Sequence, residues 1–179
     1  MSRNPFQQGN LDGLCGIYSI VNASLMVNKQ NTINAKSQFE QLINLLHEKN
    51  LLIQAMTEGL FYKNMKEILE DRTIKNLLPK TSIPFNGVKT PRLQEFWATA
   101  SEFINDTDDS RGVVIIGIAG FHDHWTVASE INANAMTLQD SSGLKRLNRK
   151  NCTTHHGTSS RRHILKPAQS FFLRGPAPQ

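Results

Sequence analysis

Hydrophobic residues recur at helical spacing along the first half of the chain. Residues 15–28 (CGIYSIVNASLMVN) and 35–50 (AKSQFEQLINLLHEKN) each place apolar positions near the spacing of one helix face. The same period indicates a helix over 58–78, which is expected to end at Pro79, and another over 90–106, where a threonine cap precedes a first-turn proline. The first half of the chain is therefore predicted to be helical.

The pattern changes to that of β-strands in the second half. Residues 112–120 (GVVIIGIAG) form a run rich in β-branched side chains, which is typical of a central strand. Residues 124–130 (HWTVASE) and 135–140 (AMTLQD) alternate around the turn residues INAN, and 169–175 (QSFFLRG) are one more candidate strand. Helices followed by an antiparallel sheet predict an α+β fold, and 179 residues predict a single domain over 1–179.

Composition narrows the classes of protein to consider. No apolar run reaches the roughly 18 residues of a membrane span, and the N-terminus MSRNPFQQGN lacks the apolar core of a secretory signal. The two cysteines, Cys15 and Cys152, do not make a disulfide framework and favour a reducing compartment. We therefore expect a cytoplasmic protein without a membrane span, or an effector exported by a route that needs no such signal.

Positive charge is concentrated toward the C-terminus. The net charge is +5, and the charged residues between 145 and 166 are all basic: Lys145, Arg146, Arg149, Lys150, Arg161, Arg162 and Lys166. Such a segment is either a solvated surface with a linker or a surface that meets nucleic acid, an anionic membrane or an acidic protein partner. Gly143, Gly157 and a Thr/Ser run argue against a recognition helix after Asp140, and the segment lacks the interleaved aromatic residues of a single-strand-binding platform, so nucleic acid is not the expected partner.

Cys15 stands where a cysteine can act as a nucleophile. It follows an Asp12–Gly13 turn and begins the predicted helix 15–28. Cysteine reacts as the thiolate, and the free N–H groups and dipole at a helix N-terminus favour negative charge. Gly16 is expected to leave room for the backbone of a substrate. On position alone, however, a lone cysteine before an apolar helix is more often structural.

His124 and Asp140 provide a base and a group that orients it. His124 begins one predicted strand and Asp140 ends the next. If the hairpin turn is centred near Asn132, the two residues lie directly opposite each other, and opposed Cβ atoms are about 4.5–5.5 Å apart. Asp140 would then hold one imidazole nitrogen while the other faces the thiolate. A register slip of one residue would turn one side chain to the wrong face.

An amide side chain upstream of Cys15 meets the third requirement, a donor for the charge that develops on the attacked carbonyl oxygen. Gln8 can place a side-chain N–H beside the backbone N–H of Cys15, and Asn10 and Gln7 are the alternatives. Gln8, Cys15, His124 and Asp140 together predict nucleophilic catalysis by a thiol.

Three motifs stand in a fixed order along the chain. QGNLDGLCG leads into a helix, HWTV follows late in the sequence, and the next strand ends in QDSSG. This order resembles the papain-like cysteine peptidases, and the most similar branches are the bacteriocin-leader-processing peptidases and the Josephin deubiquitinases. The resemblance covers the two ends of the chain and leaves residues 30 to 110 unmatched. It implies a helix that carries the cysteine, packed on a sheet that carries the histidine and the aspartate.

The resemblance also assigns roles to the four residues. It implies Cys15 as nucleophile, His124 as general base, Asp140 as orienting residue and Gln8 as oxyanion donor, with no cofactor. In these families the glutamine usually stands nearer the cysteine than Gln8 does here. Either the Asp12–Gly13 turn absorbs the extra length or Asn10 takes the role.

Other functions are compatible with parts of the sequence. Two groups of residues are candidate metal ligands: His122, Asp123 and His124 form the first, and Cys152, His155, His156 and His163 form the second. Neither has the ligand spacing typical of a zinc site, so no metal is expected. Cys152 is expected to be an inert thiol. The alternatives to a peptidase are an inactive papain-like binding module and an acyl transferase or amidase with the same triad. A peptide bond, an isopeptide bond to a ubiquitin-like protein and a peptidoglycan amide all fit as substrates.

Overall fold

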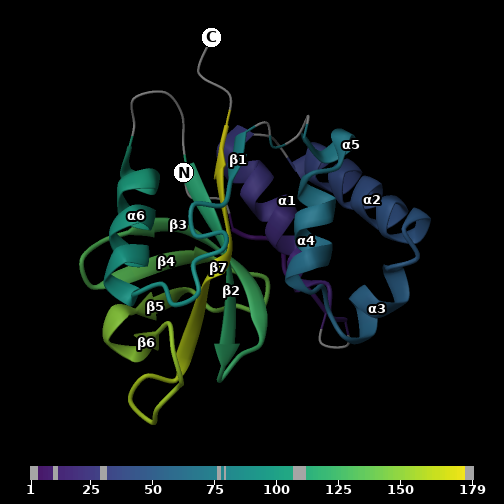
Figure 1. Ribbon diagram of the computed structural model, residues 1–179. Helices are drawn as coiled ribbons and strands as arrows, with labels where there is room; N and C mark the ends of the chain where they lie inside the picture. The colour runs from purple at the N-terminus through teal and green to yellow at the C-terminus, as the bar shows by residue number, and fades with distance from the viewer. Residues whose placement is uncertain are drawn as a thin grey trace.

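Helices lie on both sides of a central sheet (Figure 1). The computed structural model describes residues 4–9, 12–28, 32–75, 78, 80–106 and 112–175. The helices are α1 (Cys15–Asn28), α2 (Thr32–Glu48), α3 (Leu52–Thr57), α4 (Tyr62–Leu69), α5 (Arg72–Lys75) and α6 (Leu93–Asn105). Figure 1 shows α6 on one side of the sheet and the other helices gathered on the opposite side. In the described part of the chain, none of the helices combines the length and apolarity needed to cross a membrane.

The sheet is built almost entirely from the C-terminal half. Its strands are β1 (Lys80–Ser82), β2 (Gly112–Gly120), β3 (His124–Ile131), β4 (Ala135–Gln139), β5 (Arg146–Asn148), β6 (Cys152–Thr153) and β7 (His163–Arg174). They are ordered β1-β7-β2-β3-β4-β5, with β6 pairing β7. All pairs are antiparallel except β6 with β7. The prediction of an α+β fold with N-terminal helices and a C-terminal antiparallel sheet is confirmed.

Strand β2 separates two hydrophobic cores. Val113 and Ile115 point into the core shared with α1 and α4, whereas Val114 and Ile116 point into the core shared with α6. A strand buried on both faces needs apolar residues at every position rather than at alternate ones. This requirement explains the continuous run GVVIIGIAG, which forms a strand with the predicted bounds 112–120.

The helical prediction is right at α1 and wrong over 58–78. Helix α1 has the predicted bounds 15–28, but the 58–78 segment forms two helices, α4 and α5. The break comes at Asp71, whose carboxylate accepts a hydrogen bond from Thr73 N (3.0 Å) and so starts a new helix. The predicted end at Pro79 lies outside the described residues.

The other differences have local causes. Helix α2 ends at Glu48, before the predicted residue 50, because Asn50 takes a left-handed conformation (φ 56°). Strand β7 begins at His163, not at the predicted residue 169. Its first half was missed because Lys166 and Pro167 interrupt the apolar pattern that marks a strand. Helix α3 and the two- or three-residue strands β1, β5 and β6 were not predicted at all.

Candidate active site

Asp12 organises the loop that leads to Cys15. Its two carboxylate oxygens accept hydrogen bonds from Gly9 N (2.8 Å) and Leu14 N (3.1 Å). Cys15 follows as the first residue of α1, with 8 % of its surface exposed. The first bond of the helix runs from Tyr18 N to Leu14 O, so the N–H of Cys15 precedes the hydrogen-bonded turns. The thiol therefore lies at the positive end of the helix dipole.

Two glycines fix the start of α1 against the neighbouring helices. Gly13 N donates to Met56 O (2.8 Å), and a Cβ at Gly13 would lie 2.8 Å from Ala55 O. A Cβ at Gly16 would lie 2.7 Å from Met65 Sδ. The expectation that Gly16 leaves room for a substrate is therefore wrong: Gly16 is buried and makes room for α4.

Asp140 holds the His124 imidazole. His124 Nε2 lies 2.6 Å from Asp140 Oδ1, and Asp140 is 1 % exposed. The other carboxylate oxygen accepts hydrogen bonds from Ser142 N and Leu144 N, both at 2.9 Å. A carboxylate fixed by two backbone donors keeps one oxygen directed at the ring, so both position and tautomer of the imidazole are restrained.

The predicted register of the β3–β4 hairpin is wrong by two residues. Val127 pairs with Gln139, so the next pair in the same register places Asp140 opposite Thr126. His124 is two positions before Thr126, at the start of β3, and lies on the same side of the pleat. His124 and Asp140 therefore meet as diagonal neighbours on one face and are not directly opposed.

A β-bulge sets the face on which Asp140 lies. At the turn, Ile131 pairs with Met136, and that register continued without interruption would place Asp140 opposite Val127. Val127 points into the core on the other side of the pleat from His124. The register shifts between Ala128 and Glu130, where Ser129 is the extra residue, and this shift brings Asp140 to the side of His124.

The charges of the site are coupled through His124. Burial by itself lowers the pKa of His124, but hydrogen bonds with Asp140 and Cys15, together with the charges of both, raise it to about 9. Burial likewise favours the neutral form of Asp140, but its hydrogen bond and ion pair with His124 outweigh this and lower its pKa. Because Nε2 contacts Asp140, Nδ1 is the nitrogen left for the Cys15 sulfur. The site therefore favours an imidazolium between a carboxylate and the thiol.

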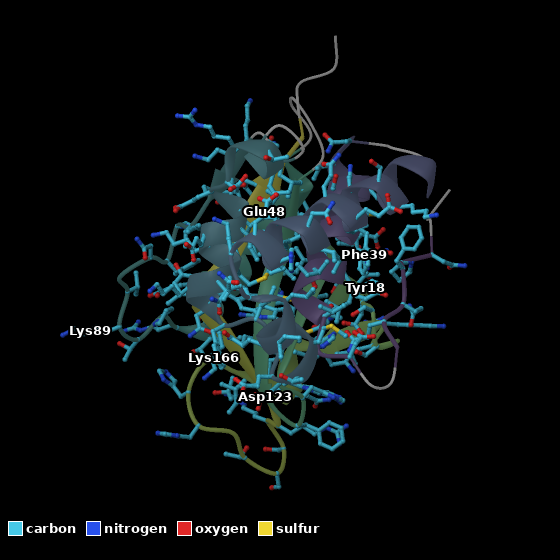
Figure 2. All side chains as sticks on the ribbon, turned by 90° about the vertical axis from the view of Figure 1, so that its right-hand side faces the viewer. Tyr18, Phe39, Glu48, Lys89, Asp123 and Lys166 are labelled. Carbon is cyan, nitrogen blue, oxygen red and sulfur yellow. The ribbon has the colours of Figure 1, made fainter. Side chains whose placement is uncertain are left out.

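Two clefts meet at His124. One, of about 490 Å³, is lined by Cys15, by Trp125 and Lys166, and by the segment 58–63, which runs from the end of α3 into the first turn of α4. The other, of about 450 Å³, is lined by Gln8 and residues 142–144. Asp123 and His124 line both. Figure 2, which faces the helical side, shows Asp123 and Lys166 in the same region of the molecule. A chain laid across both clefts would pass the Cys15–His124 pair.

Gln8 is fixed beside the second cleft. Its Nε2 donates to Asp12 O (3.1 Å), and its Oε1 accepts from Ser141 Oγ (2.9 Å). The bond to Asp12 ties Gln8 to the residue three positions before Cys15. An amide NH₂ carries two N–H groups, so one is left for another acceptor. Gln7 Nε2 instead donates to Asp140 O (3.1 Å), and Asn10 lies outside the described residues.

Trp125 is a site residue that the sequence did not single out. Its Nε1 donates to Leu60 O (2.6 Å), and the ring is 7 % exposed. This bond ties the strand of His124 to the 58–63 segment, which forms the facing wall of the Cys15 cleft. The HWTV motif contains this tryptophan, but nothing in the sequence indicated that its partner is Leu60.

We expect Trp125→Phe to lower the free energy of unfolding by about 1–2 kcal/mol, because Leu60 O loses a buried donor. The same change should reduce turnover, because the cleft wall is then less firmly held. Trp97→Phe is the matched control: Trp97 Nε1 donates to Asn132 O (2.7 Å) on the α6 side of the sheet. In urea unfolding, Trp97→Phe should lower the free energy of unfolding by a similar amount, and it should leave turnover unchanged. Equal turnover in both variants would contradict this role of Trp125.

Cys152 is separate from the site, in the core on the α6 side of the sheet. Burial raises the pKa of Cys152 to about 11, and the residue is 0 % exposed. Among the described residues, no cluster of three His, Cys, Asp or Glu side chains is arranged to hold a metal. In the basic segment, Arg149 packs over the Trp97 ring and Arg162 over the Phe121 ring. The acidic partner expected for this segment stays a prediction.

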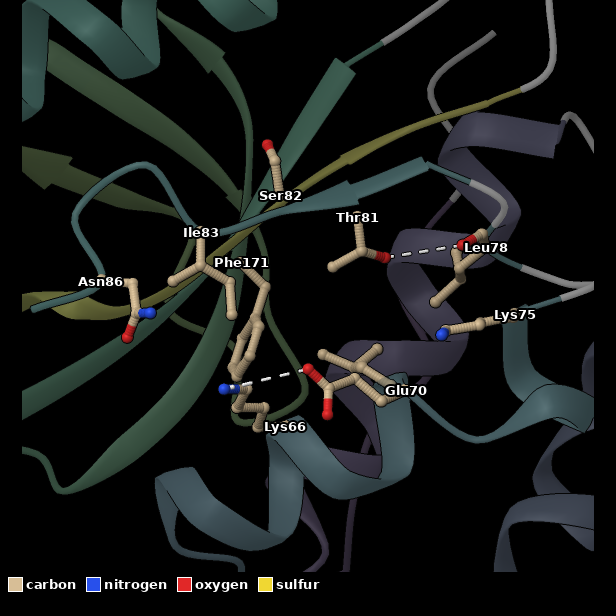
Figure 3. A pocket seen from close by; sticks show the side chains of 10 residues that line it. Lys66, Glu70, Lys75, Leu78, Thr81, Ser82, Ile83, Asn86 and Phe171 are labelled. Atoms are coloured by element: carbon tan, nitrogen blue, oxygen red, sulfur yellow. Dashed lines mark hydrogen bonds and ion pairs between the residues drawn. The ribbon is translucent and has the colours of Figure 1, made fainter.

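A further cavity of about 440 Å³ lies between α4, α5 and β1 (Figure 3). Lys66 and Glu70 form an ion pair there at 3.9 Å, and the Phe171 ring contributes to its lining. Cys15, His124, Asp140 and Gln8 do not line it. The groups that sequence reasoning selected for catalysis therefore belong to the two clefts that meet at His124.

Comparison with protein-family models, with curated proteins and with solved structures finds none that matches this chain. Its chemistry therefore has to be inferred from the geometry around Cys15, His124 and Asp140.

Proposed function

We propose that this chain is a papain-like cysteine peptidase that cleaves a peptide or isopeptide bond through an acyl-enzyme. The observation that carries the proposal is the His124 imidazole, held by the buried Asp140 carboxylate at 2.6 Å and interacting with the Cys15 thiol. A nucleophile, a base and a group that orients the base are the three parts of such a site.

The first half of the reaction forms a thioester. The Cys15 thiolate attacks the carbonyl carbon of the substrate, and a carbon–sulfur bond forms. The carbon–nitrogen bond then breaks, and the His124 imidazolium gives its proton to the leaving amine. The raised pKa of His124 supports this role, because the ring holds a proton until the amine needs it.

The oxyanion has two donors in this proposal. The backbone N–H of Cys15 precedes the hydrogen-bonded turns of α1, and Gln8 keeps one side-chain N–H beyond its bond to Asp12. Both interactions strengthen as negative charge develops on the carbonyl oxygen. Ser141 and Asp12 fix the Gln8 amide before substrate arrives, which reduces the cost of ordering it.

The second half releases the acyl group. A water molecule takes the place of the departed amine, His124 accepts one of its protons, and the resulting hydroxide attacks the thioester. The carbon–sulfur bond breaks, the acid leaves, and the thiolate–imidazolium pair is restored. Asp140 keeps the ring oriented through both halves.

The proposal is tested by the rate at which iodoacetamide alkylates Cys15 at pH 6, with glutathione as the free-thiol reference. We expect Cys15 to react at least about tenfold faster than glutathione, because the imidazolium stabilises the thiolate. His124→Ala should remove this advantage. The adduct is located by mass spectrometry, which distinguishes Cys15 from the buried Cys152.

An inactive binding module would give a different result. Without an activated thiol, Cys15 would react no faster than glutathione, and His124→Ala would not change its rate. That outcome would overturn the proposed function.

A further inference from the structure

Lys166 places a positive charge in the wall of the cleft that contains Cys15. It lies on β7, is half-buried, and lines this cleft together with Cys15 and Trp125. Figure 2 shows Lys166 in the same region of the molecule as Asp123, which also lines the cleft. Any substrate that reaches Cys15 through this cleft therefore passes near the lysine.

An irregularity in the sheet positions Lys166. Strand β7 pairs Phe171 with Ile115 and Lys166 with Gly117, so residues 167–170 face a single residue of β2. Ser170 Oγ donates to Lys166 O (3.0 Å) and closes this loop. Gly117 has no side chain, and a Cβ there would lie 3.6 Å from Lys166 Cβ. That Cβ would also lie 3.4 Å from the Trp125 ring, so the lysine stem and this ring flank Gly117 at the cleft wall.

The ammonium of Lys166 lacks an ion-pair partner within the described residues. The other charged residues of this cleft besides His124 are Glu58, Lys63 and Asp123, and all three are exposed. Water and salt screen exposed charges more than half-buried ones. Lys166 therefore makes this part of the cleft favourable for an anion.

We infer that Lys166 is a specificity residue that binds an acidic side chain of the substrate, on the acyl side of the scissile bond. This inference rests on the proposed function. The acyl side is assigned because Cys15 lines this cleft and not the second one. His124, which gives its proton to the leaving amine, stands between the two clefts, so the leaving side continues into the second.

The first test maps cleavage sites in a proteome-derived peptide library by mass spectrometry. The sites should be enriched, about tenfold, in Asp or Glu over Asn or Gln N-terminal to the cleaved bond. Lys166→Gln should remove the enrichment, and Lys166→Glu should replace it with a preference for Lys or Arg. Lys150→Gln is the matched control, because Lys150 is exposed and lines neither cleft.

The second test needs no substrate. The ratio of Cys15 alkylation rates with iodoacetate and iodoacetamide reports the potential at the sulfur, because the reagents differ in charge. Lys166→Gln should lower this ratio about threefold or more, and Lys150→Gln should leave it unchanged.

The outcomes separate this inference from the proposed function. Three results would overturn the role of Lys166 without contradicting the proposed peptidase. They are Cys15-dependent cleavage with no acidic preference, an acidic preference on the leaving side alone, and an unchanged alkylation ratio in Lys166→Gln. Absence of Cys15-dependent cleavage, with Cys15 no more reactive than glutathione, would overturn the proposed function itself.

Discussion

Cys15→Ala is expected to abolish peptide cleavage while leaving the fold intact. The substitution removes the attacking sulfur, and no other thiol in the chain can replace it, because Cys152 is buried in the opposite core. We expect turnover of the peptide library to fall by at least about 10⁴-fold, the scale on which removal of a nucleophile acts. The side chain is small, so urea unfolding should show a change of only about 1 kcal/mol.

Cys152→Ala is the matched control. It removes a sulfur that is 0 % exposed and donates to Asn148 O at 3.3 Å, so it should cost stability and leave turnover unchanged. His124→Ala should match Cys15→Ala in activity, whereas His156→Ala, which changes an exposed histidine, should have no effect. Retained cleavage in Cys15→Ala would exclude the mechanism.

Local sequence patterns were sufficient to predict the helix and the strands that carry the candidate site. Helix α1 and strand β2 have the predicted bounds, because apolar residues recur at helical spacing in the first and form a continuous buried run in the second. The contact between His124 and Asp140 was predicted because His124 begins one strand of the hairpin and Asp140 comes at the end of the other, directly after Gln139. In these regions the pattern that forms the element also positions the side chain.

Contacts between residues far apart in the sequence could not be predicted from local patterns. The expected pairing of His124 with Asp140 assumed a regular hairpin, but the contact depends on the bulge at Ser129, which no local pattern marks. Gly16 was wrongly assigned to substrate binding, because the residue that packs against it, Met65, is far away in the sequence and could not be identified as its neighbour. The wall at Leu60 was missed for the same reason, because its partner Trp125 is far along the chain. Residues 30 to 110 offered no motif, yet they provide one side of the cleft.

The bulge has a chemical consequence. A hairpin of this turn type without the extra residue would direct Asp140 away from His124, and the imidazole would lose its buried carboxylate. Ser129 is itself buried, and its hydroxyl donates to Thr137 O at 3.4 Å across the hairpin. The arrangement of Cys15, His124 and Asp140 thus depends on a backbone irregularity as much as on the identity of the three side chains.

Asp140→Ala is expected to destabilise the protein more than Cys15→Ala or His124→Ala. Three donors lose their acceptor: His124 Nε2 at 2.6 Å and the backbone N–H groups of Ser142 and Leu144 at 2.9 Å. At 1 % exposure water cannot readily replace the carboxylate, so the loss should be about 3 kcal/mol by urea unfolding at pH 6. Turnover should fall by about a hundred- to a thousandfold, less than in Cys15→Ala, because the nucleophile and base remain.

This loss of stability should depend on pH in a defined direction. The pKa of His124 is raised from 6.5 to about 9 in the folded protein, so its contribution is fully present below pH 6.5 and is lost as pH rises through 9. The pKa of Asp140 is lowered from 3.8, so its contribution is present above pH 3.8 and is lost as pH falls through the folded value. The difference in unfolding free energy between wild type and Asp140→Ala should therefore be largest between about pH 4 and 6.5 and should shrink toward pH 9.5.

Asp140→Asn separates charge from hydrogen bonding. The amide oxygen can still accept from Ser142 N and Leu144 N, so the part of the loss that is independent of pH should be smaller than in Asp140→Ala. The negative charge is absent in both variants. In wild type the free energy of unfolding should fall between pH 6.5 and 9, and in both variants this fall should be much smaller. If that decline persists unchanged in Asp140→Asn, the raised pKa of His124 comes from Cys15 alone, and Asp140 acts as a structural acceptor for the 142–144 turn and not as the group that sets the charge of the base.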